Sequence, residues 1–120
     1  MTVETHLFSA LAPLVGDRVY PDVAEEGSAL PRIVYQQVGG MRPLFQESTL
    51  PDRENCRMQI VVWAERRLDA TALGKQIEEA LIAAAGLQVE PLGGRVSRHD
   101  EEADLRGSQQ DFSIWLARQG

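Results

Sequence analysis

The sequence predicts an α+β fold in which a mainly antiparallel sheet packs against two helices. Segments with the alternation of β-strands and segments with helical periodicity follow one another in the order α-β-β-β-α-β-β. This order lacks the βαβαβ rhythm of a Rossmann fold. With 120 residues the chain has the usual size of one domain, so we expect residues 1–120 to share one hydrophobic core.

The N-terminal part predicts a short helix followed by an edge strand. Apolar residues at helical spacing lie in Glu4–Ala12, and Pro13 then disfavours continuation beyond one further turn, which Gly16 closes. The next extended piece, Arg18–Val23, contains Pro21, and proline suits the edge of a sheet because it has no N–H to donate.

Two further strands and a long loop are predicted in the middle of the chain. Arg32–Val38 is rich in β-branched and aromatic side chains, which favours a strand. Met41–Asn55 has two prolines, scattered charge and no sustained period, so we expect a long irregular loop there. Cys56–Glu65 alternates most clearly and predicts a central strand.

The second helix is predicted over Ala70–Ala85. Asp69 is placed to cap its N-terminus, Leu68 and Leu73 have the spacing of a hydrophobic staple, and Gly86 ends it. One apolar stripe on this helix faces the core and consists of Leu73, Ile77, Leu81 and Ala84.

The C-terminal part predicts two strands joined by an acidic stretch. We expect a turn at Pro91–Gly94, a strand beginning at Arg95–Arg98, a polar connection over Asp100–Asp104 that Gly107 closes, and a last strand at Asp111–Arg118.

Composition and charge exclude several function classes. Acidic residues outnumber basic ones by 18 to 12, and the formal charge of −6 disfavours non-specific binding to nucleic acid or to an anionic membrane. No apolar run approaches the roughly 20 residues of a membrane span, and the N-terminus lacks the pattern of a signal peptide. Cys56 is the single cysteine and fits a reducing compartment. We therefore expect the protein to stay in the cytoplasm.

The residue types that carry catalysis or bind metals do not form recognisable motifs. His6 and His99 belong to no pair with zinc-ligand spacing, and the carboxylates of Asp100–Asp104 do not follow the calcium-loop pattern. Neither a phosphate-binding glycine loop nor a GxSxG elbow is present. The sequence thus predicts a protein that is not an enzyme and has no cofactor site and no metal site.

The two tryptophans are out of phase with the aliphatic residues of their strands. Trp63 alternates with Met58, Ile60 and Val62, and Trp115 alternates with the apolar residues of the last strand, so both project from the opposite side of the sheet. Either one helix covers each face and buries both rings, or the rings form an exposed patch for subunit contact. The sequence leaves both arrangements open.

Arginines gather around the central strand, and such residues anchor protein interfaces or bind single-stranded nucleic acid. The acidic chain favours the interface. Together with the tryptophans and the long loop they make up the candidate oligomer or partner interface, which consists of Trp63, Trp115, Arg57, Arg66, Arg67, Met41, Arg42, Phe45 and Arg53.

The order of the segments resembles the small tail-completion (tail-terminator) family of siphophages and prophages. Leu14–Pro21 and Ala29–Gln36 resemble the start of that family, Arg57–Ala64 and the helix Ala70–Ala85 resemble its central strand and helix, and Asp111–Trp115 resembles its closing strand. The loop at Met41–Asn55 and the segment Pro91–Gly107 show no family pattern.

The resemblance implies a structural protein that assembles as a hexameric ring on the head-proximal end of the tail tube, stops tube growth and helps join head to tail. The implied partners are further copies of the chain, the tail tube protein and the head-completion protein, with no membrane and no specific nucleic acid, although DNA passes through the ring. The implied location is the cytoplasm of the bacterial host during assembly and then the virion tail.

Two other function classes remain open at this point. One is a small dimeric α+β ligand-binding domain or enzyme, which would have a pocket between sheet and helix with convergent polar groups. The other is single-strand nucleic-acid binding through the arginines and Trp63.

Overall fold

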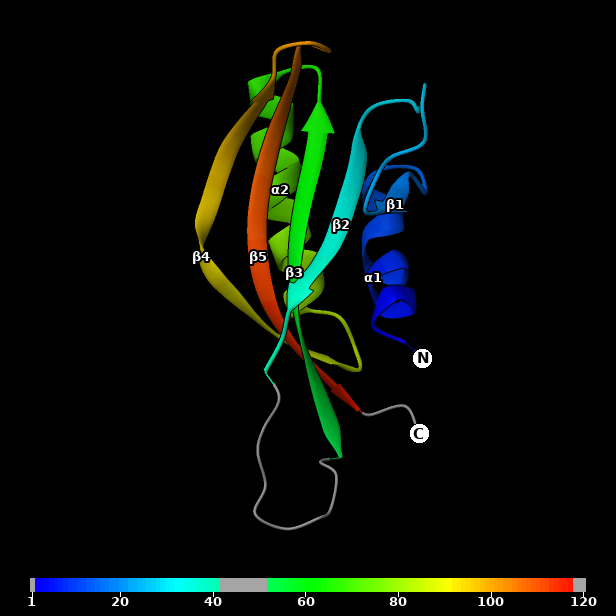
Figure 1. Ribbon diagram of the computed structural model, residues 1–120, viewed down its shortest axis with the longest axis vertical. Coiled ribbons are helices and arrows are strands. Elements are labelled where there is room, and N and C mark those ends of the chain that lie inside the picture. Colours follow the sequence, from blue (N-terminus) through cyan, green and yellow to red (C-terminus); the bar gives the residue numbers. More distant parts are fainter. Residues whose placement is uncertain (1, 42–51, 118–120) are drawn as a thin grey trace.

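The computed structural model describes residues 2–41 and 52–117, which form a five-stranded sheet with helices on one face (Figure 1). The strand order is β1-β2-β3-β5-β4, with β1 parallel to β2 and all other pairs antiparallel. The elements are α1 (Val3–Leu11), the 3-10 turn η1 (Ala12–Leu14), β1 (Val19–Pro21), β2 (Arg32–Gly39), β3 (Arg53–Ala64), α2 (Arg67–Ile82), β4 (Leu87–Asp100) and β5 (Leu105–Ala117). The predicted α+β class and element order are confirmed.

The core lies between the sheet and the two helices. Its fully buried side chains come from α1, from the Val15 turn, from α2 and from alternate positions of β2, β3 and β5. They are Phe112, Leu7, Leu11, Ile33, Met58, Ile60, Leu81, Ile114, Leu116, Val15 and Val62. Because residues of both helices belong to this one cluster, both helices cover the same face of the sheet. We call it the helix-covered face and the opposite one the helix-free face.

Helix α1 begins and ends for local reasons. The Thr2 side chain accepts a hydrogen bond from the Thr5 N–H at 3.2 Å, which caps the N-terminus. Pro13 lies in the first turn of η1, where a missing N–H costs little. Tyr35 of β2 donates to a carboxylate oxygen of Glu4 at 3.1 Å and so ties α1 to the sheet.

Helix α2 begins three residues earlier than predicted, and its predicted cap is wrong. Arg66 occupies the cap position without a side-chain cap bond, and Asp69 lies within the first turn, where the helix dipole still favours a carboxylate. Leu68 is 81% exposed and therefore makes no staple. The buried stripe consists of Ala70, Gly74, Ile77 and Leu81, with Leu73 partly buried.

The C-terminal strands are longer than predicted. The expected turn at Pro91–Gly94 is a register shift between Leu92 and Val96 inside the continuous strand β4. Strand β5 begins at Leu105, six residues before the predicted Asp111, so its polar start is already paired on both sides with β3 and β4. Ladder hydrogen bonds, which a hydrophobic pattern does not reveal, determine this part of the sheet.

Residues 42–51 of the loop predicted over Met41–Asn55 lie outside the described residues, and the predicted C-terminal end of that loop is wrong. Strand β3 begins at Arg53, which pairs with Ala117, so Arg53–Asn55 belong to the sheet and extend it beyond the helices (Figure 1). Among residues 2–41 and 52–117, neither helix combines the length and the apolar character that a membrane crossing requires.

Candidate interaction surface

The helix-free face carries the side chains that alternate with the core residues. On β3 and β5 these include Arg57, Gln59, Trp63, Asp111 and Trp115, and neither described helix packs over them. The question that the sequence left open is answered for the described residues: both tryptophans lie on the face without helices, where each is half-buried. Neighbouring side chains on the sheet cover part of each ring.

Trp63 lies at one end of this face, over a glycine. It pairs with Gly107 of β5, and a Cβ built on Gly107 would lie 2.9 Å from two ring carbons of the tryptophan. Only glycine therefore lets the ring approach the strand this closely. From β4, the Arg98 guanidinium carbon stands 5.9 Å from the ring centroid, within cation–π range.

Trp115 repeats this arrangement at the other end of the face. The Arg53 guanidinium carbon lies 5.9 Å from its ring centroid, and Arg53 also donates a 2.8 Å hydrogen bond to Gln88. Trp115 pairs with Asn55, which is eight positions from Trp63 along β3. At the usual rise of a strand the two Arg–Trp pairs are roughly 27 Å apart.

Asn55, which sequence reasoning missed, secures the end that carries Trp115. Its side chain is buried, donates to Ser113 Oγ at 2.9 Å and to the Ile114 carbonyl at 3.3 Å, and accepts the Met41 N–H at 2.8 Å. It thereby joins the ends of β2 and β3 to β5. Asparagine is uncommon in strands, so its presence next to the strand pattern at Cys56 is the signal by which the sequence could have indicated this residue.

The middle of the helix-free face is polar apart from the buried Val61. Arg57 donates to Asp111 at 2.9 and 3.1 Å, and the two side chains are 51% and 18% exposed. An ion pair this exposed contributes at most about 1 kcal/mol to stability. Arg57 thus lies on the same face as the tryptophans but already has a partner within the chain.

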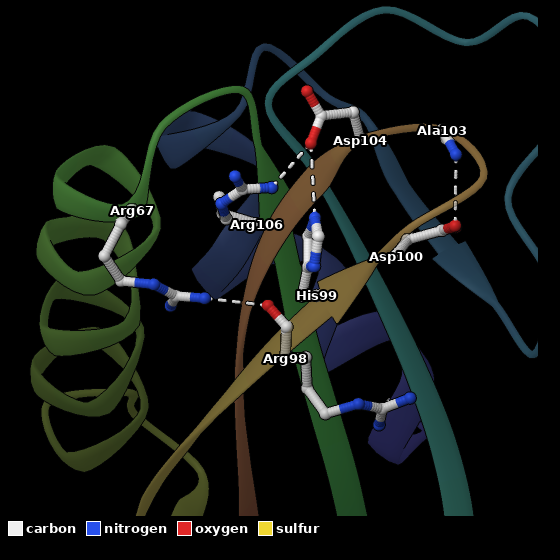
Figure 2. A network of polar contacts seen from close by, with 7 residues as sticks. All are labelled: Arg67, Arg98, His99, Asp100, Ala103, Asp104 and Arg106. Carbon is white, nitrogen blue, oxygen red and sulfur yellow. Dashed lines mark hydrogen bonds and ion pairs between the residues drawn. The ribbon is translucent and has the colours of Figure 1, made fainter.

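The remaining predicted residues lie elsewhere. Arg67, in the first turn of α2, donates to the backbone carbonyls of Gly107 and Arg98, both at 2.7 Å, and so fastens α2 to the β4–β5 hairpin. Figure 2 shows the bond to Arg98. Arg66 is exposed just before α2, and Met41 is 63% exposed after β2. Arg42 and Phe45 lie outside the described residues.

The predicted arginines within the described residues therefore do not form one cluster. Arg53 and Arg57 lie on the first part of β3, whereas Arg66 and Arg67 follow its last residue. Arg98, which stacks on Trp63, was not among the predicted residues, because only the strand register brings β4 across β5 to that ring.

The acidic stretch Asp100–Asp104 forms a tight turn in which the carboxylates of Asp100 and Asp104 accept hydrogen bonds (Figure 2). Asp104 has a positive φ of 52° and accepts a 2.8 Å bond from Arg106, while His99 Nε2 lies 3.2 Å from the same oxygen. Arg106 first, and then His99, lowers the pKa of Asp104. Asp100 accepts the Ala103 N–H. Within the described ranges no three metal-ligating side chains are grouped to hold an ion.

A pocket of about 490 Å³ lies where β3 ends and α2 begins. Leu30 and Pro31, just before β2, form one side, and Ala64 and Glu65 form the end. The first turns of α2 close it with Asp69, Ala72, Leu73 and Gln76. The walls are apolar apart from one amide and two carboxylates. The titratable groups among its described lining residues are the carboxylates of Glu65 and Asp69.

Comparison with known proteins agrees with the order of elements. The family described as Tail completion protein gp17 matches residues 5–117. The fold is similar to that of a chain in the virion of a native gene transfer agent particle, with a TM-score of 0.65 and 19% identity over 97% of this chain and 95% of that one. No curated protein sequence matches. The resemblance seen in the sequence is confirmed: the chain belongs to the tail completion protein gp17 family, whose members are structural proteins of phage tails.

Proposed function

We propose that the chain forms a hexameric ring that caps the head-proximal end of the tail tube and helps join head to tail. Membership of the tail completion family supports a role in the phage tail. The observation that carries the proposal is the helix-free face, on which two tryptophans lie uncovered by any described helix, each beside an arginine.

The residue types on this face are those of protein interfaces. Tryptophan and arginine are the residues whose truncation most often costs an interface its affinity, and they act best when water is excluded around them. The region between the two Arg–Trp pairs contains Gln59 and the Arg57–Asp111 ion pair as well as the buried Val61. Mixed polarity of this kind is usual for interfaces between proteins that also exist apart.

The charge of the chain is compatible with a ring through which DNA passes. A ring of identical acidic subunits presents little attraction to a polyanion, so DNA would not be held by non-specific contacts with phosphate. We therefore assign the aromatic and basic side chains of the helix-free face to contacts with protein.

A tube-capping assay tests the proposal. Tail tube protein is polymerised alone and with the chain, and tube length and end structure are measured by electron microscopy. We expect the wild-type chain to bind one tube end as a ring and to shorten the tubes. A folded Trp63→Ala/Trp115→Ala double variant should lose this effect, whereas Lys75→Ala, at an exposed position of α2, should retain it. Tubes that grow equally long and uncapped with the wild-type chain would refute the proposal.

A further inference from the structure

We infer that the pocket between β3 and α2 receives the Arg53–Trp115 pair of a second copy of the chain. This inference rests on the proposed ring, and it adds which two surfaces of neighbouring subunits meet. A closed ring of identical subunits needs two different patches on each subunit, one complementary to the other. The Arg53–Trp115 pair supplies one patch, and the pocket supplies the other.

The pocket has an uncompensated negative charge. Glu65 and Asp69 are the charged residues among its described lining, and neither carboxylate has a hydrogen bond or ion pair with another described residue. Asp69 is available because it does not cap α2. Two carboxylates beside apolar walls favour a cationic group on an apolar stem.

An exposed leucine extends the apolar side of the pocket. Leu68 is the most exposed of the large hydrophobic side chains in the described part of the chain, at 81%. It precedes the lining residue Ala72 by four positions, so the two lie on the same flank of α2. Leu68 therefore offers an apolar surface to an aromatic ring that approaches the pocket.

The Arg53–Trp115 pair has the complementary chemistry. Arg53 is exposed and donates one of its N–H groups to Gln88, which leaves other donors free to point outward. A planar guanidinium suits two carboxylates better than an ammonium does, and the tryptophan beneath it holds its position. The ring of Trp115 would then meet Leu68.

The two patches of one subunit cannot meet each other. Arg53 begins β3 and Ala64 ends it, eleven positions later, so at the usual rise of a strand they are roughly 36 Å apart. The pair can therefore enter only the pocket of another copy, and in the proposed ring each copy uses the pocket of one neighbour and offers its own pocket to the other. Such a head-to-tail contact closes into a ring when the rotation between copies allows it.

Mixing two complementary variants tests the inference. Arg53→Ala/Trp115→Ala removes the inserted pair and keeps the pocket, and Glu65→Lys/Asp69→Lys reverses the charge of the pocket and keeps the pair. Self-association is measured by sedimentation velocity at high concentration. We expect the wild-type chain to associate and each variant to associate at least about tenfold more weakly. An equimolar mixture of the variants should form a dimer of one chain of each kind and nothing larger.

The controls separate this inference from the proposed function. Glu79→Lys/Glu90→Lys changes the charge equally at exposed positions away from the pocket and should associate like the wild type. Circular dichroism and thermal unfolding verify that each variant is folded. A wild-type chain that stays monomeric, variants that associate normally, or a mixture that stays monomeric would each overturn the inference. If the wild-type chain still caps tubes in any of these cases, the proposed function stands and only the pairing of surfaces is wrong.

Discussion

The two faces of the sheet share the same strands but carry opposite kinds of side chain. On the helix-covered face, β3 and β5 present Met58, Ile60, Phe112 and Ile114, all at most 2% exposed. On the helix-free face the same strands present arginine, glutamine and tryptophan that are partly open to solvent. In this protein the fully buried side chains of the sheet therefore gather on one face, and the other face keeps large side chains in partial contact with water.

Truncation of the core aromatic should have the largest effect on stability. Phe112→Ala removes a side chain with no exposed surface and should lower the free energy of unfolding by about 3–5 kcal/mol, because the lost burial and the new cavity both contribute. Urea unfolding measures the change. The preceding residue, Asp111, lies on the helix-free face, and Asp111→Ala should lower the free energy of unfolding by less than about 1 kcal/mol. Equal losses of unfolding free energy in the two variants would show that the two faces do not differ in their contribution to stability.

Asn55 is a buried polar residue on the helix-free face. Asn55→Ala leaves the Met41 N–H without its acceptor and removes two bonds to β5, so stability should fall by about 1–3 kcal/mol. Chemical denaturation checks this value. Gln59→Ala, on the same face of the same strand, is the matched control and should be close to neutral. A neutral Asn55→Ala variant would show that the end of β3 does not depend on this side chain.

The tryptophans should separate stability from assembly. Trp63→Ala removes a half-buried ring and should cost roughly 1–2 kcal/mol of stability, less than Phe112→Ala, because part of the ring already contacts water. It should nevertheless abolish most tube capping. Thermal unfolding and the capping assay on the same preparation measure both quantities. Stability and capping lost in proportion would instead indicate a core role for the ring.

The smallest expected effect is a loss of stability at alkaline pH that depends on Tyr35, which lies on the helix-covered face. Burial first, and then the hydrogen bond to Glu4, raises the pKa of Tyr35 from 10.0 to about 12. Because the folded-state pKa lies above the unfolded value, this interaction stabilises the fold fully below pH 10 and loses its effect as the pH rises from 10 to about 12.

Tyr35→Phe tests this pH dependence. The variant should be less stable than the wild type at neutral pH by about 1 kcal/mol, and the difference should shrink as the pH approaches 12. Urea unfolding at a series of pH values measures the difference, with Tyr20→Phe as the control for the other tyrosine. A difference that does not change with pH would mean that the hydroxyl group does not link α1 to β2 through its proton.

The sequence predicted the parts of the fold that hydrophobic burial determines. The alternation in Cys56–Glu65 and the stripe through Ile77 and Leu81 led directly to the core, because the aliphatic residues that they place on the inner side are buried, namely Met58, Ile60, Val62, Ile77 and Leu81. The alternation also placed both tryptophans on the correct face. The family followed from the order of these segments.

The parts that depend on partners distant in the sequence were missed. The polar start of β5 has no hydrophobic pattern, and its pairing with two neighbouring strands makes it a strand. Arg98 reaches Trp63 through the register of β4, which no local pattern reveals. Asp69 looked like a cap because aspartate commonly is one, but the helix begins earlier. At the candidate interaction surface, Gly107 was a sequence signal that went unused, because a glycine inside a strand often marks the close approach of another group.

Gly107 has a consequence for how related chains can vary. A side chain at position 107 and an indole at position 63 would occupy the same space, so the two positions cannot change independently. We expect relatives with a smaller residue at 63 to tolerate a side chain at 107, and relatives with tryptophan at 63 to keep glycine there. Positions 63 and 107 would then change together during evolution. A lineage in which the contact made by position 63 changed would therefore show substitutions at both positions.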